Sequence, residues 1–218
     1  AYFRPAGVMD MAAGIDDKGT VTSIEFINYN SGTSGLNCPY AIPNRRLRFQ
    51  PCESPVREGS YRALASTANT FAREAFLDQV AKTVGKDPLA FRIELLTDER
   101  LKNILQAACD RFGWGKHAAP GHAHGLACGT EKGSVVATCA ELRVDTDAKS
   151  YAITRLCVAF ECGPIHNPQN LESQVVGCVI MGLGAVLNEA IAFEDGKLLN
   201  PRFKDYFVPR FEDAPPID

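Results

Sequence analysis

The 218-residue chain carries 23 Lys and Arg against 26 Asp and Glu, a formal net charge of −3 with a pI near 5.9. This balance gives no reason to expect nucleic acid or an anionic membrane surface as a partner. Hydrophobic residues make up 45% of the chain and charged residues 22%, as in a globular protein with a substantial core. No uninterrupted run of about 18 apolar residues is present, so we expect no membrane-spanning segment.

The N-terminus and the cysteines bear on the origin of the chain. AYFRPAGVMD has neither an initiator Met nor the basic, apolar and small-residue regions of a signal peptide, so we expect a piece of a longer polypeptide. Eight cysteines are scattered without a CxxC pair. This pattern favours reduced, mostly buried thiols and a cytoplasmic location.

The first half of the chain predicts two strands and then three helices. Residues 20–29, TVTSIEFINY, alternate polar and apolar side chains as in a half-buried strand. Residues 30–46 are rich in Gly, Ser, Asn and Pro and predict a loop before a short strand at 47–51. Apolar spacing and capping residues predict the helices. They cover residues 67–84, 88–96 and 101–112, with N-cap Asp87, stops at Gly85 and Gly113, and a face of Phe71, Ala75, Phe76 and Val80 on the first helix.

The second half predicts a linker, two strands, a long helix and a hairpin. Residues 115–125, GKHAAPGHAHG, are small, polar and aperiodic, which is typical of a linker. The other elements are expected at residues 135–145, 151–162, 168–191 and 191–199. We therefore predict an α/β (α+β) fold with two sheet-plus-helix subdomains, residues 1–116 and 117–218.

Two half-clusters of metal-binding residue types raise the possibility of a zinc site. One is Cys162 with His166, and the other contains His122, His124 and Cys128. A structural zinc site needs four ligands with short pair spacings, and these groups lie about forty residues apart without such pairs. Core thiols and solvated histidines are the favoured interpretation.

The stretch VVGCVIMGLGAVLNEA allows a nucleotide-binding interpretation as strand, G-L-G and helix. Gly182 and Gly184 supply two glycines of that fingerprint, but Leu187 occupies the place of the third. A continuous helix fits better, because Asn167 is a good N-cap and Pro168 suits the first helical position.

One face of this helix is rich in small and polar residues. Gln174, Gly177, Met181, Gly184 and Asn188 fall on it at helical spacing. Two glycines inside a helix cost about 1 kcal/mol each relative to alanine, so something is expected to approach this face closely. Tight packing against a sheet and a cofactor beside the Gln174 amide both remain open.

Nucleophilic catalysis has little support in the sequence. No GxSxG motif is present, and no Ser or Cys can be paired with a base from the sequence. Glu131 in the Gly-flanked GTEKGS stretch is a candidate carboxylate, although a solvated loop position is the favoured interpretation.

Three segments resemble one known family. They are REGSYRALASTANTFAREAFLDQVA with DPLAFRIELL, GTEKGSVVATCAELRVD, and ECGPIHNPQNLESQVVGCVIMGLGAVLNEA with NPRFKDYFVPRFEDAPPI. In the same order they resemble segments of the molybdopterin-binding subunits of the xanthine dehydrogenase and aldehyde oxidase family. The likeness is closest to bacterial isoquinoline 1-oxidoreductase and membrane-associated aldehyde dehydrogenase large subunits.

The resemblance implies roles for individual residues. Arg62 matches the arginine segment near the molybdenum ligands, and Ala63 the adjacent backbone position. Gln174 matches a glutamine that reaches the pterin, and Gly133 and Ser134 match a core loop near the site.

Leu64 stands where xanthine-oxidising members place an aromatic residue that sandwiches a purine. The resemblance therefore implies a substrate-facing position at Leu64, and its aliphatic side chain argues against a purine. It implies instead an aldehyde or N-heteroaromatic substrate.

The implied activity is hydroxylation with oxygen from water at a molybdopterin cofactor, for which the cytosine dinucleotide form is one alternative. The implied partners are an iron-sulfur subunit and a cytochrome or flavin subunit. A periplasmic or membrane-associated complex is the alternative to a cytoplasmic one.

No catalytic residue is assigned within this chain. The family's general base is a glutamate in a Gly-rich motif, which we expect beyond Asp218. We expect a middle fragment that alone neither holds the cofactor nor turns over. A non-catalytic assembly module and an NAD-dependent dehydrogenase are the rival hypotheses.

Overall fold

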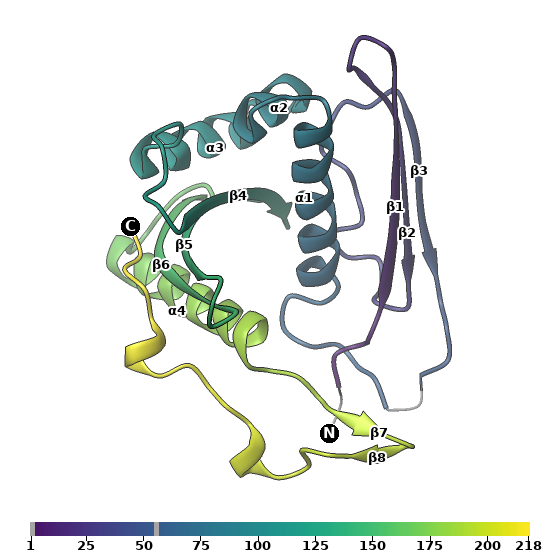
Figure 1. The fold of residues 1–218 in the computed structure, drawn as a ribbon, viewed down its shortest axis with the longest axis vertical. Helices are drawn as coiled ribbons and strands as arrows, with labels where there is room; N and C mark the ends of the chain where they lie inside the picture. Colours follow the sequence, from purple (N-terminus) through teal and green to yellow (C-terminus); the bar gives the residue numbers. More distant parts are fainter. Residues whose placement is uncertain (1–2, 55–56) are drawn as a thin grey trace.

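The computed structural model describes residues 3–54 and 57–218, which form two three-stranded sheets with helices between and beside them (Figure 1). The strands of the sheets are β1 (Val8–Ile15), β2 (Val21–Tyr29), β3 (Asn44–Gln50), β4 (His122–Glu131), β5 (Ser134–Asp145) and β6 (Ser150–Glu161). The helices are α1 (Ser66–Thr83), α2 (Pro88–Leu95), α3 (Glu99–Phe112) and α4 (Pro168–Leu187). A small hairpin of β7 (Phe193–Glu194) and β8 (Lys197–Leu198) and two short 3-10 turns follow, at Phe203–Asp205 and Phe211–Asp213. This mixture of helices and open sheets confirms the predicted fold class.

The first sheet has the order β1-β2-β3. Strand β1 pairs antiparallel with β2, and β2 pairs parallel with β3. Alternate residues of β2 face the core from Ile24 onward, where Ile24, Phe26 and Asn28 are all buried, and Val21 is buried at the start of the strand. This alternation agrees with the predicted strand at 20–29.

The second sheet is an antiparallel meander of β4, β5 and β6. Strand β4 includes residues that were expected to belong to a linker, and that expectation is wrong. His122 pairs with Arg143, and the ladder continues without interruption to Glu131 opposite Ser134. Small residues form a strand here because β5 supplies every backbone partner and because Leu126 and Cys128 are buried.

Helix α1 separates the two sheets in Figure 1, and α3 packs on β5 and β6. One hydrophobic cluster runs through this arrangement, from Ile24 and Tyr40 to Leu77, Leu105 and Cys139. The predicted subdomain boundary at residue 116 falls in the connection between α3 and β4, and it remains a prediction.

The helix boundaries follow the capping residues that the sequence supplied. Asp87 accepts hydrogen bonds from the Leu89 and Ala90 amides at 2.9 and 3.0 Å. Gly113 ends α3 in the left-handed conformation at φ 83°. Asn167 caps α4 through a 2.9 Å bond from the Asn170 amide, and α4 ends at Leu187, four residues before its predicted end.

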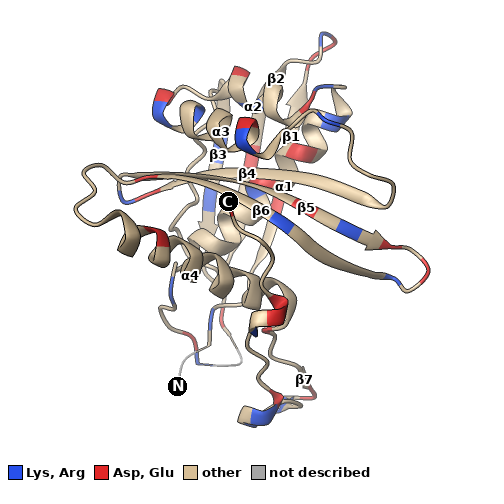
Figure 2. Ribbon diagram, turned by 90° about the vertical axis from the view of Figure 1, so that its left-hand side faces the viewer, with Lys and Arg blue, Asp and Glu red and all other residues tan. Residues whose placement is uncertain are grey.

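Helix α4 is the main departure from the composition-based expectation. Its length of 20 residues and a mean hydropathy of 1.5 over an 18-residue window are those of a membrane-crossing helix, although core helices of soluble proteins meet the same test. Glu172 is its one charged residue, and Figure 2 shows α4 largely free of charge. The absence of an uninterrupted apolar run therefore did not exclude a helix of this composition.

The apolar face predicted for the first helix is partly wrong. Phe71 is 73% exposed, whereas Leu77 is 1% exposed and packs in the core. The buried face of α1 instead includes Arg73 and Glu74. Because these charged residues are buried, the face of α1 that packs in the core differs from the one that apolar spacing predicts.

A pair of alanine substitutions tests this orientation. We expect Leu77→Ala to lower the free energy of unfolding by about 2–5 kcal/mol, because it leaves a cavity in the core. Phe71→Ala should change it by no more than about 0.5 kcal/mol. Urea denaturation of both variants is the measurement, and a larger loss for Phe71→Ala would contradict the observed orientation.

Candidate functional site

The turn before α1 has an unusual backbone. Ala63 and Leu64 are consecutive non-glycine residues with positive φ, 66° and 50°. This left-handed conformation costs an L-residue roughly 1–2 kcal/mol. Strained backbone of this kind is concentrated at functional sites, so the turn is a candidate independently of any resemblance.

The side chain of Arg62 extends from this turn toward α4. Its Nη1 lies 3.2 Å from Met181 Sδ. Met181 is on the helix face that also carries Gln174, two turns earlier. The structure thus brings the first and last of the three predicted cofactor-binding segments together.

The two glycines on that face of α4 serve different purposes. A Cβ at Gly184 would lie 2.9 Å from Pro209 Cδ, so the C-terminal segment packs closely here. A Cβ at Gly177 would meet no atom of the described residues within 4 Å. Tight packing therefore explains Gly184, whereas the part of the face with Gly177 and exposed Gln174 is open to a ligand.

The third predicted segment, Gly133 and Ser134, lies in the β4–β5 hairpin. Lys132 and Gly133 form its turn, with φ 49° and 83°. Glu131 accepts a 2.6 Å hydrogen bond from Ser66 Oγ at the start of α1, which ties the hairpin to the strained turn.

A polar hollow of about 410 Å³ lies between this hairpin and the loop before β3. It is lined by Thr33, Ser34, Gly35, Asn37, Thr130, Glu131, Lys132 and Gly133. Glu131 is therefore a wall residue bound to Ser66, and the hollow adjoins the predicted cofactor loop.

The predicted residues carry donors that suit an anionic, hydrogen-bonding group such as a pterin phosphate. They are the Arg62 guanidinium beside Met181, the exposed Gln174 amide two turns earlier on α4, and the half-buried Ser134 hydroxyl of the hairpin. Leu64 is 40% exposed beside them. The roles of Arg62, Ala63, Leu64, Gly133, Ser134 and Gln174 remain predictions that this arrangement supports.

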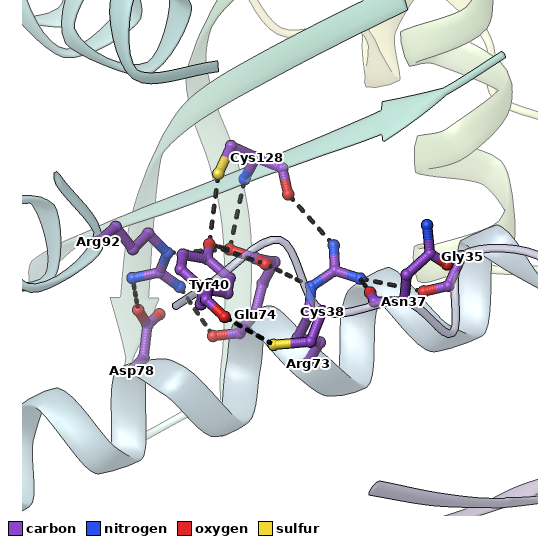
Figure 3. Close-up of polar contacts among 9 residues, drawn as sticks. All are labelled: Gly35, Asn37, Cys38, Tyr40, Arg73, Glu74, Asp78, Arg92 and Cys128. Carbon is purple, nitrogen blue, oxygen red and sulfur yellow. Dashed lines mark hydrogen bonds and ion pairs between the residues drawn. The ribbon is translucent and has the colours of Figure 1, made fainter. Parts of the chain in front are cut away.

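A buried ionic cluster beneath the site was missed by the sequence analysis (Figure 3). The Glu74 carboxylate accepts from Arg73 Nε and Arg92 Nε, each at 2.9 Å. It also accepts from Tyr40 Oη at 2.9 Å, and Asp78 pairs with Arg92 Nη1 at 2.7 Å. Glu74 and Arg73 are 3% exposed and Arg92 is 0% exposed, so two buried cations share one buried anion, and the partly exposed Asp78 supplies the second negative charge.

The cluster connects the elements that surround the site. Arg73 Nη1 donates to the carbonyl oxygens of Gly35 and Asn37, each at 3.0 Å, in the loop that lines the hollow. Arg73 Nη2 lies 3.5 Å from the Cys128 carbonyl oxygen in β4. Arg73 thereby holds the loop wall of the hollow to α1, while the Ser66–Glu131 bond holds the hairpin wall.

Burial has a clear effect on the titrating groups of the cluster. Desolvation, with the nearby Glu74 charge, raises the pKa of Cys128 to about 12. The same two causes raise the pKa of Tyr40 well above its usual value. Both groups therefore stay protonated at neutral pH and serve as hydrogen-bonding partners, without acting as bases.

Neither alternative site of the sequence analysis is formed. In residues 3–54 and 57–218, no group of three or more His, Cys, Asp or Glu side chains is arranged to hold a metal ion. His122 Nδ1 contacts Glu141 at 2.7 Å, and His124 packs edge-to-face against Phe112. Residues 168–187 form one helix, so the strand–G-L-G–helix interpretation, and with it the NAD-dependent dehydrogenase hypothesis, loses its basis.

Comparison with known sequences identifies the second half of the chain. Residues 110–215 match the molybdopterin cofactor-binding domain. The match includes the hairpin with Gly133 and Ser134 and the whole of α4. This accounts for α4 as a helix of a cofactor-binding domain.

Curated relatives cover most of the chain. It is 25% identical to one of the subunits of nicotinate dehydrogenase from Pseudomonas putida, over 83% of the chain and 17% of that protein. It is 26% identical to the beta subunit of isoquinoline 1-oxidoreductase from Brevundimonas diminuta, over 82% of the chain and 23% of that protein. It is 27% identical to a membrane-bound aldehyde dehydrogenase of Gluconacetobacter polyoxogenes, over 80% of the chain and 25% of that protein. The chain thus spans a quarter or less of these relatives.

Solved structures share the fold at low sequence identity. Quinoline 2-oxidoreductase from Pseudomonas putida 86 superposes with a TM-score of 0.80 at 12% identity, covering 97% of this chain and 54% of that one. An aldehyde oxidoreductase from Desulfovibrio desulfuricans gives 0.77 at 11% identity, covering 98% and 43%. The chain therefore shares the fold of these two oxidoreductases. Residues 110–215 thus belong to the molybdopterin cofactor-binding domain, and most of the chain is similar to the large subunits of isoquinoline 1-oxidoreductase and aldehyde dehydrogenase that its motifs indicated.

The buried cluster makes a prediction about stability. Glu74→Gln removes the charge that both buried arginines share, and we expect a loss of about 3–5 kcal/mol in the free energy of unfolding. Glu94→Gln, at the exposed ion pair with Lys86, is the control and should cost less than about 1 kcal/mol. Equal losses in urea denaturation would contradict a special role for Glu74.

The glycines of α4 make a second prediction. Gly177→Ala should stabilise the protein by up to about 1 kcal/mol, because alanine favours the helix and space is available. Gly184→Ala forces the Pro209 ring to move and should be less stable than Gly177→Ala by about 1–3 kcal/mol. Thermal unfolding of the two variants decides this, and the reverse order would show that Pro209 does not pack against α4.

Proposed function

We propose that this chain is part of a molybdenum-dependent oxidoreductase and holds a molybdopterin cofactor between the turn at residues 61–65, the β4–β5 hairpin and α4. The observation that carries the proposal is the contact of Arg62 with Met181 on the Gln174 face of α4. It joins a segment outside the matched cofactor-binding domain to a helix inside it.

The chemistry of these residues suits the cofactor. Molybdopterin, when bound, supplies the redox chemistry of the molybdenum centre. The guanidinium of Arg62 offers charge-assisted hydrogen bonds to a phosphate or oxo group, and the Gln174 amide both donates and accepts. At Gly177 a Cβ would meet no atom of the described residues within 4 Å, which supports the approach of a cofactor to this face. A cytosine dinucleotide extension is proposed as the alternative form of the cofactor.

The proposed reaction is hydroxylation of an aldehyde or an N-heteroaromatic ring, with the oxygen taken from water. Relatives are named for nicotinate, isoquinoline and aldehyde oxidation, which supports these two substrate classes. Leu64, 40% exposed in the strained turn, presents an aliphatic surface that suits either class better than an aromatic clamp around a purine.

The proposed electron acceptors are iron-sulfur centres of a partner subunit, with a flavin or cytochrome subunit beyond them. Several relatives are named as single subunits of larger enzymes, among them the gamma subunit of a 6-hydroxypseudooxynicotine dehydrogenase complex from Paenarthrobacter nicotinovorans. This supports a multi-subunit enzyme as the setting of the chain.

Substitution of Gln174 tests the proposal. In the full-length protein, Gln174→Ala should lower the molybdenum content per polypeptide about tenfold or more, because a hydrogen-bonding partner of the cofactor is lost. Ser173→Ala, one position away on α4, is the matched control and should retain molybdenum. Metal analysis and absorbance of the released pterin give the result.

Two outcomes would count against the proposal. If the wild-type full-length protein binds no molybdenum, the non-catalytic assembly module replaces it. If Gln174→Ala retains the cofactor fully, the assignment of this helix face is wrong.

A further inference from the structure

Arg4 lies against the strained turn, although it is about sixty residues away in the sequence. Its Nη1 donates to the Leu64 carbonyl oxygen at 2.8 Å and to Thr67 Oγ1 at 3.3 Å. Its Nη2 donates to the Arg62 carbonyl oxygen at 2.8 Å, and its guanidinium lies 4.8 Å from the Tyr61 ring centroid. One planar group therefore contacts the turn before, within and after its two left-handed residues.

The backbone around Arg4 is itself fixed beside this turn. The Phe3 amide donates to the Arg57 carbonyl oxygen at 3.0 Å, and the Gly59 amide donates to the Phe3 carbonyl oxygen at 3.2 Å. Asn30 Nδ2 also donates to the Ala6 carbonyl oxygen at 3.1 Å. Arg4 is thus held on both sides along the chain and reaches the turn from a defined position.

The planar guanidinium of Arg4 contacts the backbone on both sides of Ala63. Arg4 binds the carbonyl oxygens of Arg62 and Leu64, which flank Ala63. With the Leu64 amide donating to the Tyr61 carbonyl oxygen at 2.8 Å, these contacts fix both ends of the left-handed pair. A lysine has a single ammonium group and cannot reproduce this planar, two-pronged contact.

We propose that Arg4 is a positioning residue that holds the turn at residues 61–65 in its strained conformation and thereby keeps Arg62 directed at the Gln174 face of α4. This inference rests on the proposed function for its effect on cofactor binding. Its effect on the conformation of the turn follows from the contacts of Arg4 and does not require the proposed function.

The experiment combines Arg4→Ala with a glycine substitution at the strained position, in the full-length protein. Hydrogen exchange of the Leu64 and Ser66 amides reports the turn, and molybdenum per polypeptide reports cofactor retention. Arg4→Ala should speed exchange at these amides about tenfold, because hydrogen bonds from a charged group are lost. It should also lower the molybdenum content.

Ala63→Gly tests whether Arg4 acts through the conformation of the turn. If Arg4 only stabilised the fold, Ala63→Gly would not restore the molybdenum content that Arg4→Ala lowers. Glycine adopts positive φ at little cost, so Ala63→Gly in the Arg4→Ala background should restore most of the molybdenum content. Arg4→Lys should resemble Arg4→Ala, and Arg143→Ala, at an exposed arginine of β5, is the control that should change neither readout. If Arg4→Ala does not fold, Arg4→Lys carries the same comparison.

The results separate this inference from the proposed function. Unchanged exchange at Leu64 and Ser66 in Arg4→Ala overturns the positioning role. Faster exchange with full molybdenum retention overturns the link to the cofactor. Absence of molybdenum from the wild-type protein overturns the proposed function, while the exchange measurement still decides whether Arg4 holds the turn.

Discussion

The pairing of one carboxylate with two buried guanidinium groups is the interaction on which the site depends. The single carboxylate of Glu74 contacts Arg73, Arg92 and Tyr40. Through these residues the cluster joins α1 to α2, to the loop before β3 and to β4. A charge in a dry interior is tolerated only when its partners are complete. The geometry of this cluster therefore fixes how α1 stands between the two sheets, and the start of α1 is where the predicted cofactor segments meet.

Local features of the fold could be predicted from the sequence because their causes are local. Asp87, Gly113 and Asn167 cap or end helices through bonds to residues a few positions away. Strands β2 and β5 show the alternation that burial of one face demands. The family motifs likewise lie in short contiguous segments, so the cofactor-binding residues could be proposed from the sequence alone.

The remaining features depend on partners distant in the sequence. Strand β4 has small, weakly alternating residues, and only its ladder with β5 defines it. Strand β1 was not predicted, because its exposed and half-buried residues show little apolar signal until β2 lies beside them. Glu74 and Arg73 read as a polar helix face, since nothing nearby in the sequence shows that Arg92 and Gly35 will meet them. The exposure of Phe71 has the same cause, because burial of Arg73 and Glu74 with these distant partners places Phe71 on the outer face of α1.

The parallel pairing of β3 with β2 leaves β3 at the open edge of the first sheet. An open edge presents unpaired backbone groups on which the strand of another molecule can grow. Strand β3 reads NRRLRFQ, so Arg45, Arg46 and Arg48 lie along this edge, and Arg46 has Glu25 beside it at 2.8 Å. Two copies meeting at β3 would bring these cations together, so the strand that completes the sheet also discourages its extension into an aggregate.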